Sequence, residues 1–542
     1  MFWANPIKVL KGWIEPNWMV FSSTQQLRLW LFAILVGFLV AAAAIVFRLG
    51  IGGVQWFWLG ESGENIIATV QATPAWIIIL APTIGGLFVG AFLQYVHPIK
   101  RAEGVADVIE ARAQCGKGLK FWQSLDSAAI TIISLGSGAS AGREGPIVHL
   151  GASLANSLCE FAALKPAARR TLLACGVACA VSASFNAPIA GVLFAHEVIL
   201  GHYAFSAFVP IVMSSAIGAI LSRLYFGDVA SFIIPDYQIT SYWEIPSFAL
   251  LGIICALVAV LFQFSLLGTD WLARHIKMPL ILRPVLGGFL IGCLALFYPH
   301  ILGVGYEATD LALKQQLPLT LLLSLIVAKT AATAITLASR FGGGIFSPSL
   351  YIGAMVGGTF GLIAQQVFPE LASTHGLYSL LGMGAVAAAV LGAPISTTMI
   401  VFELTGGYAL SIALLLTVSL SNGLAIALQG RSYFHWQLAM RGVFLNEGNH
   451  QYLVKQVRVS EFYTPLEEDV AIEETVLHLD MPSVRLQDSL ELALHKFDDL
   501  GGASLAVLNP DKPGRIIGWA HQVDALRHFN QMLIDSQVEE HR

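Results

Sequence analysis

The sequence predicts an all-α polytopic membrane protein built from two repeated halves and followed by a small α/β tail. Three observations indicate this fold class. Only 12% of the 542 residues are charged, whereas a soluble domain usually has about 25%. Long apolar stretches could each cross a hydrocarbon core of about 30 Å. Finally, two parts of the apolar region share the same short motifs in the same order.

Seven apolar stretches are the candidate membrane spans. Each has few or no charged residues, and a spanning helix needs about 20 predominantly apolar residues. We therefore expect a multi-pass protein in a lipid bilayer and not a large soluble protein with buried helices. The stretches lie near residues 29–47, 74–93, 205–221, 246–268, 284–298, 318–338 and 408–428.

Composition divides the chain into three parts. Residues 1–26 form an N-terminal segment that lacks the short apolar core and cleavage site of a secretory signal. Residues 27–450 contain the apolar stretches and form the expected transmembrane domain. Residues 455–542 have a soluble pattern, and about 484–530 predict the order strand, helix, strand, strand, helix.

Internal repetition predicts a binding site between two halves of the transmembrane domain. The halves, about 27–226 and 244–430, each contain an Ala-Pro-Ile motif with a glutamate nine residues after its proline. These glutamates, Glu197 and Glu403, stand at equivalent places, which indicates a shared structural role such as helix capping. The sequence leaves open whether the repeats are inverted. The matching prolines, at shifts of 202 and 206 residues, are Pro146 with Pro348 and Pro188 with Pro394.

Three glycine-rich segments interrupt the apolar sequence. Irregular backbone at membrane depth persists only where it is buried in protein or lines a watery cavity. We expect each segment to begin a new helix, whose first N–H groups are unpaired and carry about half a positive charge. Several such helix starts at one point would bind an anion and still release it. The segments are Gly136-Ser-Gly-Ala-Ser140, Gly142-Arg-Glu-Gly-Pro146 and Gly342-Gly-Gly-Ile-Phe-Ser-Pro348.

Together with Phe185-Asn-Ala-Pro-Ile-Ala-Gly-Val-Leu-Phe-Ala-His-Glu197, these segments resemble the motifs of CLC chloride channels and chloride–proton antiporters. The resemblance covers about residues 27–445. It implies the CLC fold with about eighteen helical segments, chloride as the substrate, and a homodimer with one anion pathway per subunit. The tail resembles one cystathionine-β-synthase (CBS) motif. Because such motifs normally pair to form a nucleotide cleft, we do not expect nucleotide binding.

The resemblance also assigns roles to individual residues. Glu144 would be the gating glutamate, whose carboxylate takes an outer anion site and leaves when protonated or displaced. Placing a charged side chain at membrane depth costs about 2.5–3.5 kcal/mol of free energy. The Glu144 carboxylate would therefore need the hydrogen-bond donors of an anion site as partners. Ser137 would offer its hydroxyl to the central chloride, since proline there is associated with nitrate and methionine with fluoride. The backbone N–H groups assigned to anions are those of Ile345 and Phe346 centrally and of Arg143, Glu144, Gly145 and Ser347 at the outer site.

Two of these residues also have simpler structural interpretations, and the sequence differs from the family pattern at two places. Glu144 could be a capping carboxylate, and Ser137 an ordinary turn serine. The usual GSGIP reads GSGAS here, which bears on local geometry more than on chemistry. In the family, a tyrosine closes the inner side of the chloride site. Counting along the sequence places Phe434 at this position, with Tyr433 one residue earlier. We expect Phe434 to face the pathway, which would weaken the central site, and Tyr433 is the alternative donor.

The inner proton-relay position bears on mechanism. Proton-coupled members carry two consecutive glutamates at this place, but here Val198 follows Glu197. Valine cannot carry a proton, and the neighbouring His196 points about 100° away on a helix. We therefore expect channel-like or weakly coupled chloride conduction. A chloride/proton antiporter that uses water or another residue is the alternative, because some members without this glutamate still exchange protons.

Other functions are not expected from this sequence. It has no nucleophile–base pair and no HExxH-like site of an intramembrane enzyme, and a cation path should show acidic rings. The six cysteines form no disulfide framework or metal motif. We expect no metal, cofactor or nucleic-acid partner. We expect a bacterial inner membrane as the location, with both termini in the cytoplasm.

Overall fold

The chain forms two compact units in the computed structural model, residues 1–436 and 437–542. The described residues are 11–15, 26–63, 65–114, 118–164, 166–227, 232, 239–405, 410–443, 457–466, 482–500, 503–508 and 516–541. The expected composition boundary near residue 450 lies outside these ranges.

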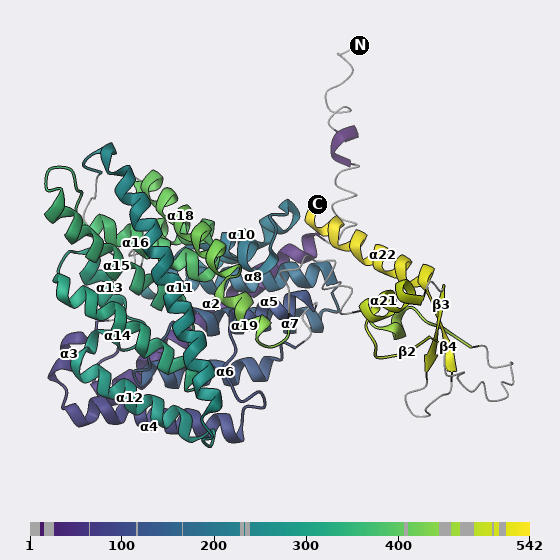
Figure 1. Cartoon of the computed structure of the whole chain (residues 1–542), viewed down its shortest axis with the longest axis horizontal. Coiled ribbons are helices and arrows are strands. Elements are labelled where there is room, and N and C mark those ends of the chain that lie inside the picture. The colour runs from purple at the N-terminus through teal and green to yellow at the C-terminus, as the bar shows by residue number, and fades with distance from the viewer. Residues whose placement is uncertain are drawn as a thin grey trace, which may run out of the picture. The chain divides into compact units, whose positions relative to one another are not determined.

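The described part of the transmembrane domain is built from helices joined by turns and loops, as expected (Figure 1). Eighteen α-helices, α2 to α19, run through its described part, which confirms the predicted fold class. They are α2 (Gln26–Leu59), α3 (Ile67–Ala72), α4 (Ala75–Tyr95), α5 (Val105–Ala113), α6 (Phe121–Gly136), α7 (Glu144–Phe161), α8 (Pro166–Phe185), α9 (Pro188–Phe194), α10 (Phe205–Phe226), α11 (Ile245–His275), α12 (Leu282–Phe297), α13 (Tyr306–Leu313), α14 (Leu319–Ala338), α15 (Phe346–Val367), α16 (His375–Leu391), α17 (Pro394–Thr405), α18 (Ser411–Gln429) and α19 (Tyr433–Ala439). A π-helix, η1 (Ala195–Leu200), follows α9, and 3₁₀ turns η2 (Tyr242–Glu244) and η3 (Pro299–Ile301) precede α11 and α13.

Seven helices among the described residues are long and apolar enough to span a membrane. Six of them contain stretches expected from the sequence. The stretch at 284–298 instead forms α12, which has 16 residues and is shorter than a full span. The seventh candidate is α15, which the sequence did not indicate because its many glycine and polar residues lower its hydropathy. It is also the most buried of the seven.

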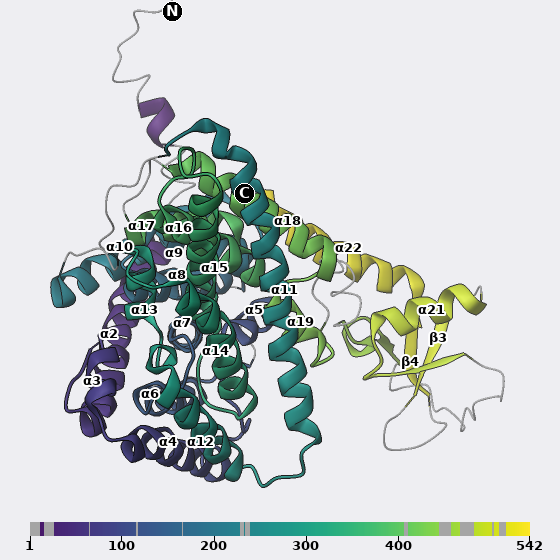
Figure 2. The same ribbon diagram turned by 60° about the vertical axis from the view of Figure 1, so that its left-hand side comes forward.

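Glycine lets equivalent helix pairs approach closely in the two halves. In α7 and α8, a Cβ on Gly151 or Gly176 would collide with the carbonyl oxygen of the other residue. In α15 and α16, Gly353 and Gly382 stand in the same relation. Figures 1 and 2 show α15 and α16 side by side within the helix bundle. The sequence repeat is therefore also a repeat of packing.

Equivalent segments of the two halves pair with each other in opposite directions. Gly142 and Gly344, 202 residues apart, exchange two backbone hydrogen bonds of 2.7 Å in an antiparallel bridge. Glu197, just beyond α9, accepts hydrogen bonds at the start of α17, and Glu403 near the end of α17 accepts them at the start of α9. Helices α9 and α17 therefore run antiparallel. This answers the question left open by the sequence: the repeats are inverted.

Only two of the three glycine-rich segments begin helices as expected. The segments at 142–146 and 342–348 lead into α7 and α15. The expectation is wrong for 136–140, which ends α6 at Gly136. The physical reason is Gly138, whose φ of +107° stops the helix as a left-handed C-terminal residue does.

The second unit contains a four-stranded sheet in the order β1-β4-β3-β2. The predicted order of strand, helix, strand, strand and helix is confirmed, although the last helix extends beyond residue 530. Strands β2 and β3 are parallel, and β4 is antiparallel to both β3 and β1. The elements are η5 (Val459–Glu461), β1 (Thr464–Pro465), β2 (Ser483–Arg485), α21 (Leu490–Leu500), β3 (Ser504–Leu508), β4 (Ile516–His521) and α22 (Gln522–His541).

The glycine contacts predict opposite effects of the same substitution at two helical sites. Gly353→Ala should destabilise the protein by about 1–3 kcal/mol, because the new methyl group meets the α16 backbone. Gly423→Ala in α18 meets nothing within 4 Å and should stabilise by about 0.5–1 kcal/mol through helix propensity. Size-exclusion chromatography after heating in detergent measures both, and equal stability of the two variants would contradict the packing argument.

Candidate anion site

The starts of α7 and α15 meet at the Gly142–Gly344 bridge. The first N–H groups of each helix have no partner within the helix, and each helix start carries a partial positive charge. Helix α7 begins at Glu144 after Arg143, and α15 begins at Phe346 after Ile345. The inverted repeat therefore brings two positive helix ends to one buried place.

The Glu144 carboxylate lies at this junction and is 1% exposed. Its Oε1 accepts a hydrogen bond of 2.6 Å from the Ser347 hydroxyl and one of 3.1 Å from the Tyr306 hydroxyl. Its Oε2 has no hydrogen-bond partner among the described residues. Oε2 lies over Gly142, where a Cβ would come within 2.6 Å of it and within 3.1 Å of the Ser347 nitrogen. The carboxylate thus occupies a place suited to an anion and is held mainly through one oxygen.

Rigid neighbours surround the two helix starts. The Phe346 ring packs against Phe185 and Phe194, with ring centroids 4.9 and 5.8 Å away. The Arg143 guanidinium donates to the Ser184 carbonyl and lies over the Tyr306 ring, 5.0 Å from its centroid. The backbone of both helix starts is therefore fixed by packing around the carboxylate.

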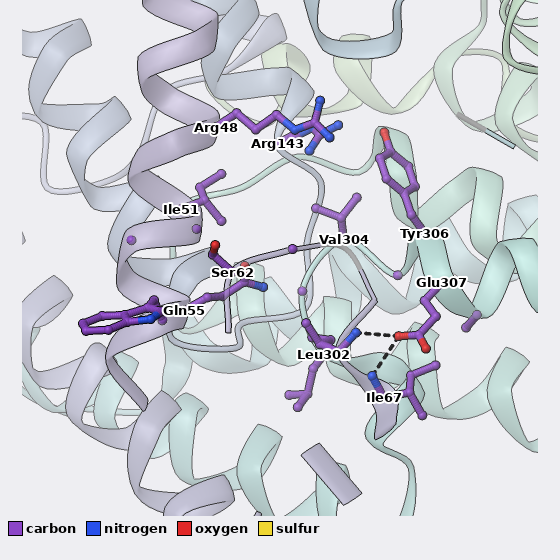
Figure 3. A pocket seen from close by; sticks show the side chains of 18 of the residues that line it. Arg48, Ile51, Gln55, Ser62, Ile67, Arg143, Leu302, Val304, Tyr306 and Glu307 are labelled. Carbon is purple, nitrogen blue, oxygen red and sulfur yellow. Dashed lines mark hydrogen bonds between the residues drawn. The ribbon is translucent and has the colours of Figure 1, made fainter. Parts of the chain in front are cut away.

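A cavity of about 540 Å³ adjoins the site. Arg143 and Tyr306, which flank Glu144, form part of its wall, and Arg48 adds a second guanidinium (Figure 3). At the other end, Glu307 accepts hydrogen bonds from the backbone of Ile66 and Ile67 and so caps α3. The two arginines favour anions in the part of the cavity next to Glu144.

Tyr306 is the site residue that sequence reasoning missed. It begins α13 directly after Gly305, whose φ is +92°. A Gly-x-Gly-Tyr segment at a helix start, Gly303 to Tyr306, is a signal of the same kind as the three glycine-rich segments. It lies outside the two matched motifs, so only the fold shows that its hydroxyl reaches Glu144.

The structure does not bring Ser137 to this junction through any hydrogen bond of the described residues. Ser137 caps the C-terminus of α6, where carbonyl groups carry a partial negative charge that disfavours an anion. Its hydroxyl donates to the Ser134 carbonyl at 3.0 Å and lies against Gly85 of α4. The contact of Ser137 with chloride stays a prediction, and this location argues for a structural role.

Tyr433 and Phe434 both lie at the start of α19 and are buried. Their ring centroids are 6.4 Å apart, with the planes at 67°. The aromatic contact described for these rings is the one between them. Which of the two faces the pathway therefore stays a prediction.

Val198 lies in η1, directly after the capping Glu197. The structural role predicted for Glu197 is confirmed, because its carboxylate accepts from the backbone of Ile395 at 3.1 Å and of Ser396 at 2.8 Å, and from the Ser396 hydroxyl. His196 bonds elsewhere, with its Nδ1 3.0 Å from the His202 carbonyl. Neither neighbour replaces a carboxylate at the position of Val198.

The chain resembles known membrane transport proteins in sequence. A sequence model of the family described as "Voltage gated chloride channel" matches residues 85–425. The putative chloride channel protein ClcB-like of Ralstonia nicotianae is 33% identical over 390 residues, which are 70% of this chain and 90% of that protein. The H(+)/Cl(−) exchange transporter ClcA of Klebsiella pneumoniae is 29% identical over 422 residues, which are 74% of this chain and 87% of that protein.

Solved structures share the fold. A slow cyanobacterial Cl−/H+ antiporter superposes with a TM-score of 0.68 at 23% identity and covers 76% of this chain and 98% of its own. A CLC-type fluoride/proton antiporter gives a TM-score of 0.62 at 20% identity and covers 75% of this chain and 96% of its own. This chain therefore belongs to the voltage-gated chloride channel (CLC) family and is a multi-pass membrane protein that transports anions.

Proposed function

We propose that the protein exchanges chloride for protons across a membrane, with the Glu144 carboxylate as the gate. The observation that carries the proposal is the position of this carboxylate at two helix starts, held by two hydroxyl groups. A carboxylate and a chloride ion have the same charge and accept the same hydrogen bonds. Each can therefore replace the other at the two helix starts.

Protonation links the exchange of the two ions. At a dehydrated site, a carboxylate that gains a proton loses its attraction to the helix starts. It then leaves, and chloride takes its place at the outer site beside the N–H groups of Arg143, Gly145 and Ser347. Chloride would reach Glu144 through the cavity lined by Arg48 and Arg143. When the carboxylic acid releases its proton, the carboxylate displaces chloride again.

Relatives support the exchange mechanism over the channel-like conduction expected from Val198. One similar protein is named an H(+)/Cl(−) exchange transporter, and one solved structure with the same fold is a Cl−/H+ antiporter. A channel remains the second candidate, because Val198 cannot relay a proton. The relative named as a putative chloride channel is compatible with either mechanism.

The remaining expectations belong to the same proposal. We place the protein in a bacterial inner membrane as a homodimer with one pathway per subunit and both termini in the cytoplasm. The order of β2, α21, β3, β4 and α22 supports one CBS-like motif in the tail. We do not expect it to bind a nucleotide alone. Tyr433 or Phe434 would close the inner side of the pathway.

The two hydroxyl donors predict faster transport when either is removed. Tyr306→Phe and Ser347→Ala should each weaken the hold on Glu144 by about 1.5 kcal/mol, or about tenfold in occupancy, and so raise chloride efflux from liposomes. Tyr351→Phe is the matched control, because this buried hydroxyl has no hydrogen bond among the described residues. Efflux from Tyr306→Phe equal to that from the control would remove Tyr306 from the gate.

Glu144→Gln tests the proposed function directly. The amide cannot release a proton, so chloride transport should continue while proton transport falls to background. Purified protein in liposomes, with chloride electrode and pH electrode read together, measures both fluxes. Exchange in the unchanged protein appears as proton flux driven by a chloride gradient. A reversal potential at the chloride Nernst value, unmoved by a pH gradient, would instead identify a channel.

A further inference from the structure

A buried acid–base pair, with one member in α7 and the other just before α5, takes no part in the gate described above. Glu103, two residues before α5, is 5% exposed, and His149 in α7 is 1% exposed. The His149 Nε2 lies 3.7 Å from the Glu103 Oε1. Ionisable side chains at membrane depth are costly, and proton relays are one of the functions that keep them there.

Hydrogen bonding does not give His149 a structural role. Neither of its ring nitrogens has a hydrogen-bond partner in the part of the chain that the structure describes, whereas buried polar groups are usually satisfied. The Glu103 backbone is fixed separately, because its N–H donates to the Ser127 hydroxyl at 2.8 Å. The His149 ring is therefore buried beside Glu103 without a hydrogen bond that would explain its burial.

Charged groups connect the pair with the surface. Asp107 in α5 and Arg101 before it form an ion pair, and their side chains are 11% and 23% exposed. His97 lies 4.0 Å from Asp126 of α6, whose side chain is 28% exposed. Arg101 and Asp107 lie within four residues of Glu103 along the chain. Polar and ionisable groups thus continue outward from the buried pair.

Two elements packed against α7 and α5 carry further titratable side chains among the described residues. Helix α8 contributes the thiols of Cys175 and Cys179, and the latter donates to the Gly37 carbonyl. The π-helix η1 contributes His196 and Glu197, which bond to His202 and α17 as described above. These groups are already used in packing between helices.

The pair shares α7 with the gate and borders the element that contains the lost relay position. His149 follows Glu144 by five residues in α7, an axial rise of about 7.5 Å. Helix α5, which follows Glu103, packs against both α7 and η1, the element that contains Val198. Around the helix the two side chains are about 140° apart, so a proton that passes from the pair to Glu144 needs water between them, but it needs no side chain at position 198.

We propose that Glu103 and His149 form an internal proton relay that takes over the role missing at Val198. Glu103 takes up a proton that reaches it from solution and passes it from Oε1 to His149 Nε2. The resulting imidazolium releases its Nδ1 proton through water to Glu144, which leaves neutral histidine as its other tautomer. The inference rests on the proposed exchange function, because a channel needs no relay.

Paired flux measurements test the relay. Glu103→Gln and His149→Gln should each lower the ratio of protons to chloride at least about tenfold while chloride transport continues, because a positioned proton-transfer group contributes about 10²–10⁴-fold. His196→Gln is the matched control: it alters another buried histidine and should keep the ratio of the unchanged protein. Continued chloride transport also shows that each variant is folded.

The outcomes separate the relay from the exchange function. No proton flux in the unchanged protein would overturn the exchange function and the relay with it. Proton flux in the unchanged protein with the same ratio in His149→Gln would overturn the relay alone. If Glu103→Gln also stops chloride transport, His149→Gln decides: a lower ratio supports the relay, and an unchanged ratio overturns it.

Discussion

The competition between a carboxylate and a halide for two helix starts is the interaction on which the site depends. Main-chain N–H groups at the starts of α7 and α15 attract an anion without a full positive charge. Because no fixed cation is bonded to the Glu144 carboxylate in the described residues, the carboxylate can leave its place at modest cost. The two hydroxyl donors, Tyr306 and Ser347, then set how long it stays.

The inverted repeat makes this arrangement possible. The Gly142–Gly344 bridge joins equivalent residues of the two halves, so each half supplies one helix start to the same point. The reciprocal caps of α9 and α17 by Glu403 and Glu197 fix a second pair of equivalent helices. Close contacts at glycine residues then pack α7 against α8 and α15 against α16. A binding site between repeats follows from the symmetry and needs no special element.

The sequence predicted the features that depend on local pattern. Apolar stretches indicated the membrane helices, and the matched Ala-Pro-Ile motifs indicated the repeat and the capping glutamates. Glycine with proline correctly predicted the helix starts at Glu144 and Phe346. The same reasoning failed at Gly136 to Ser140, because glycine also ends helices, and the sequence does not give the sign of φ at Gly138.

Residues that meet only in the folded chain could not be predicted. Tyr306 reaches Glu144 across 162 residues of sequence, and Glu103 reaches His149 across a helix boundary. No periodicity or spacing encodes these contacts. The sequence also did not indicate α15, because its glycine and serine residues lower its hydropathy. These residues serve close packing and the anion site.

Anomalous diffraction from crystals soaked in bromide tests the central claim most directly. Bromide replaces chloride and can be located without assumptions about the protein. In the unchanged protein we expect a bromide peak beside the N–H groups of Ile345 and Phe346. In Glu144→Gln we expect a further peak where the Glu144 carboxylate lies. Bromide absent from both helix starts in both crystals would contradict the account.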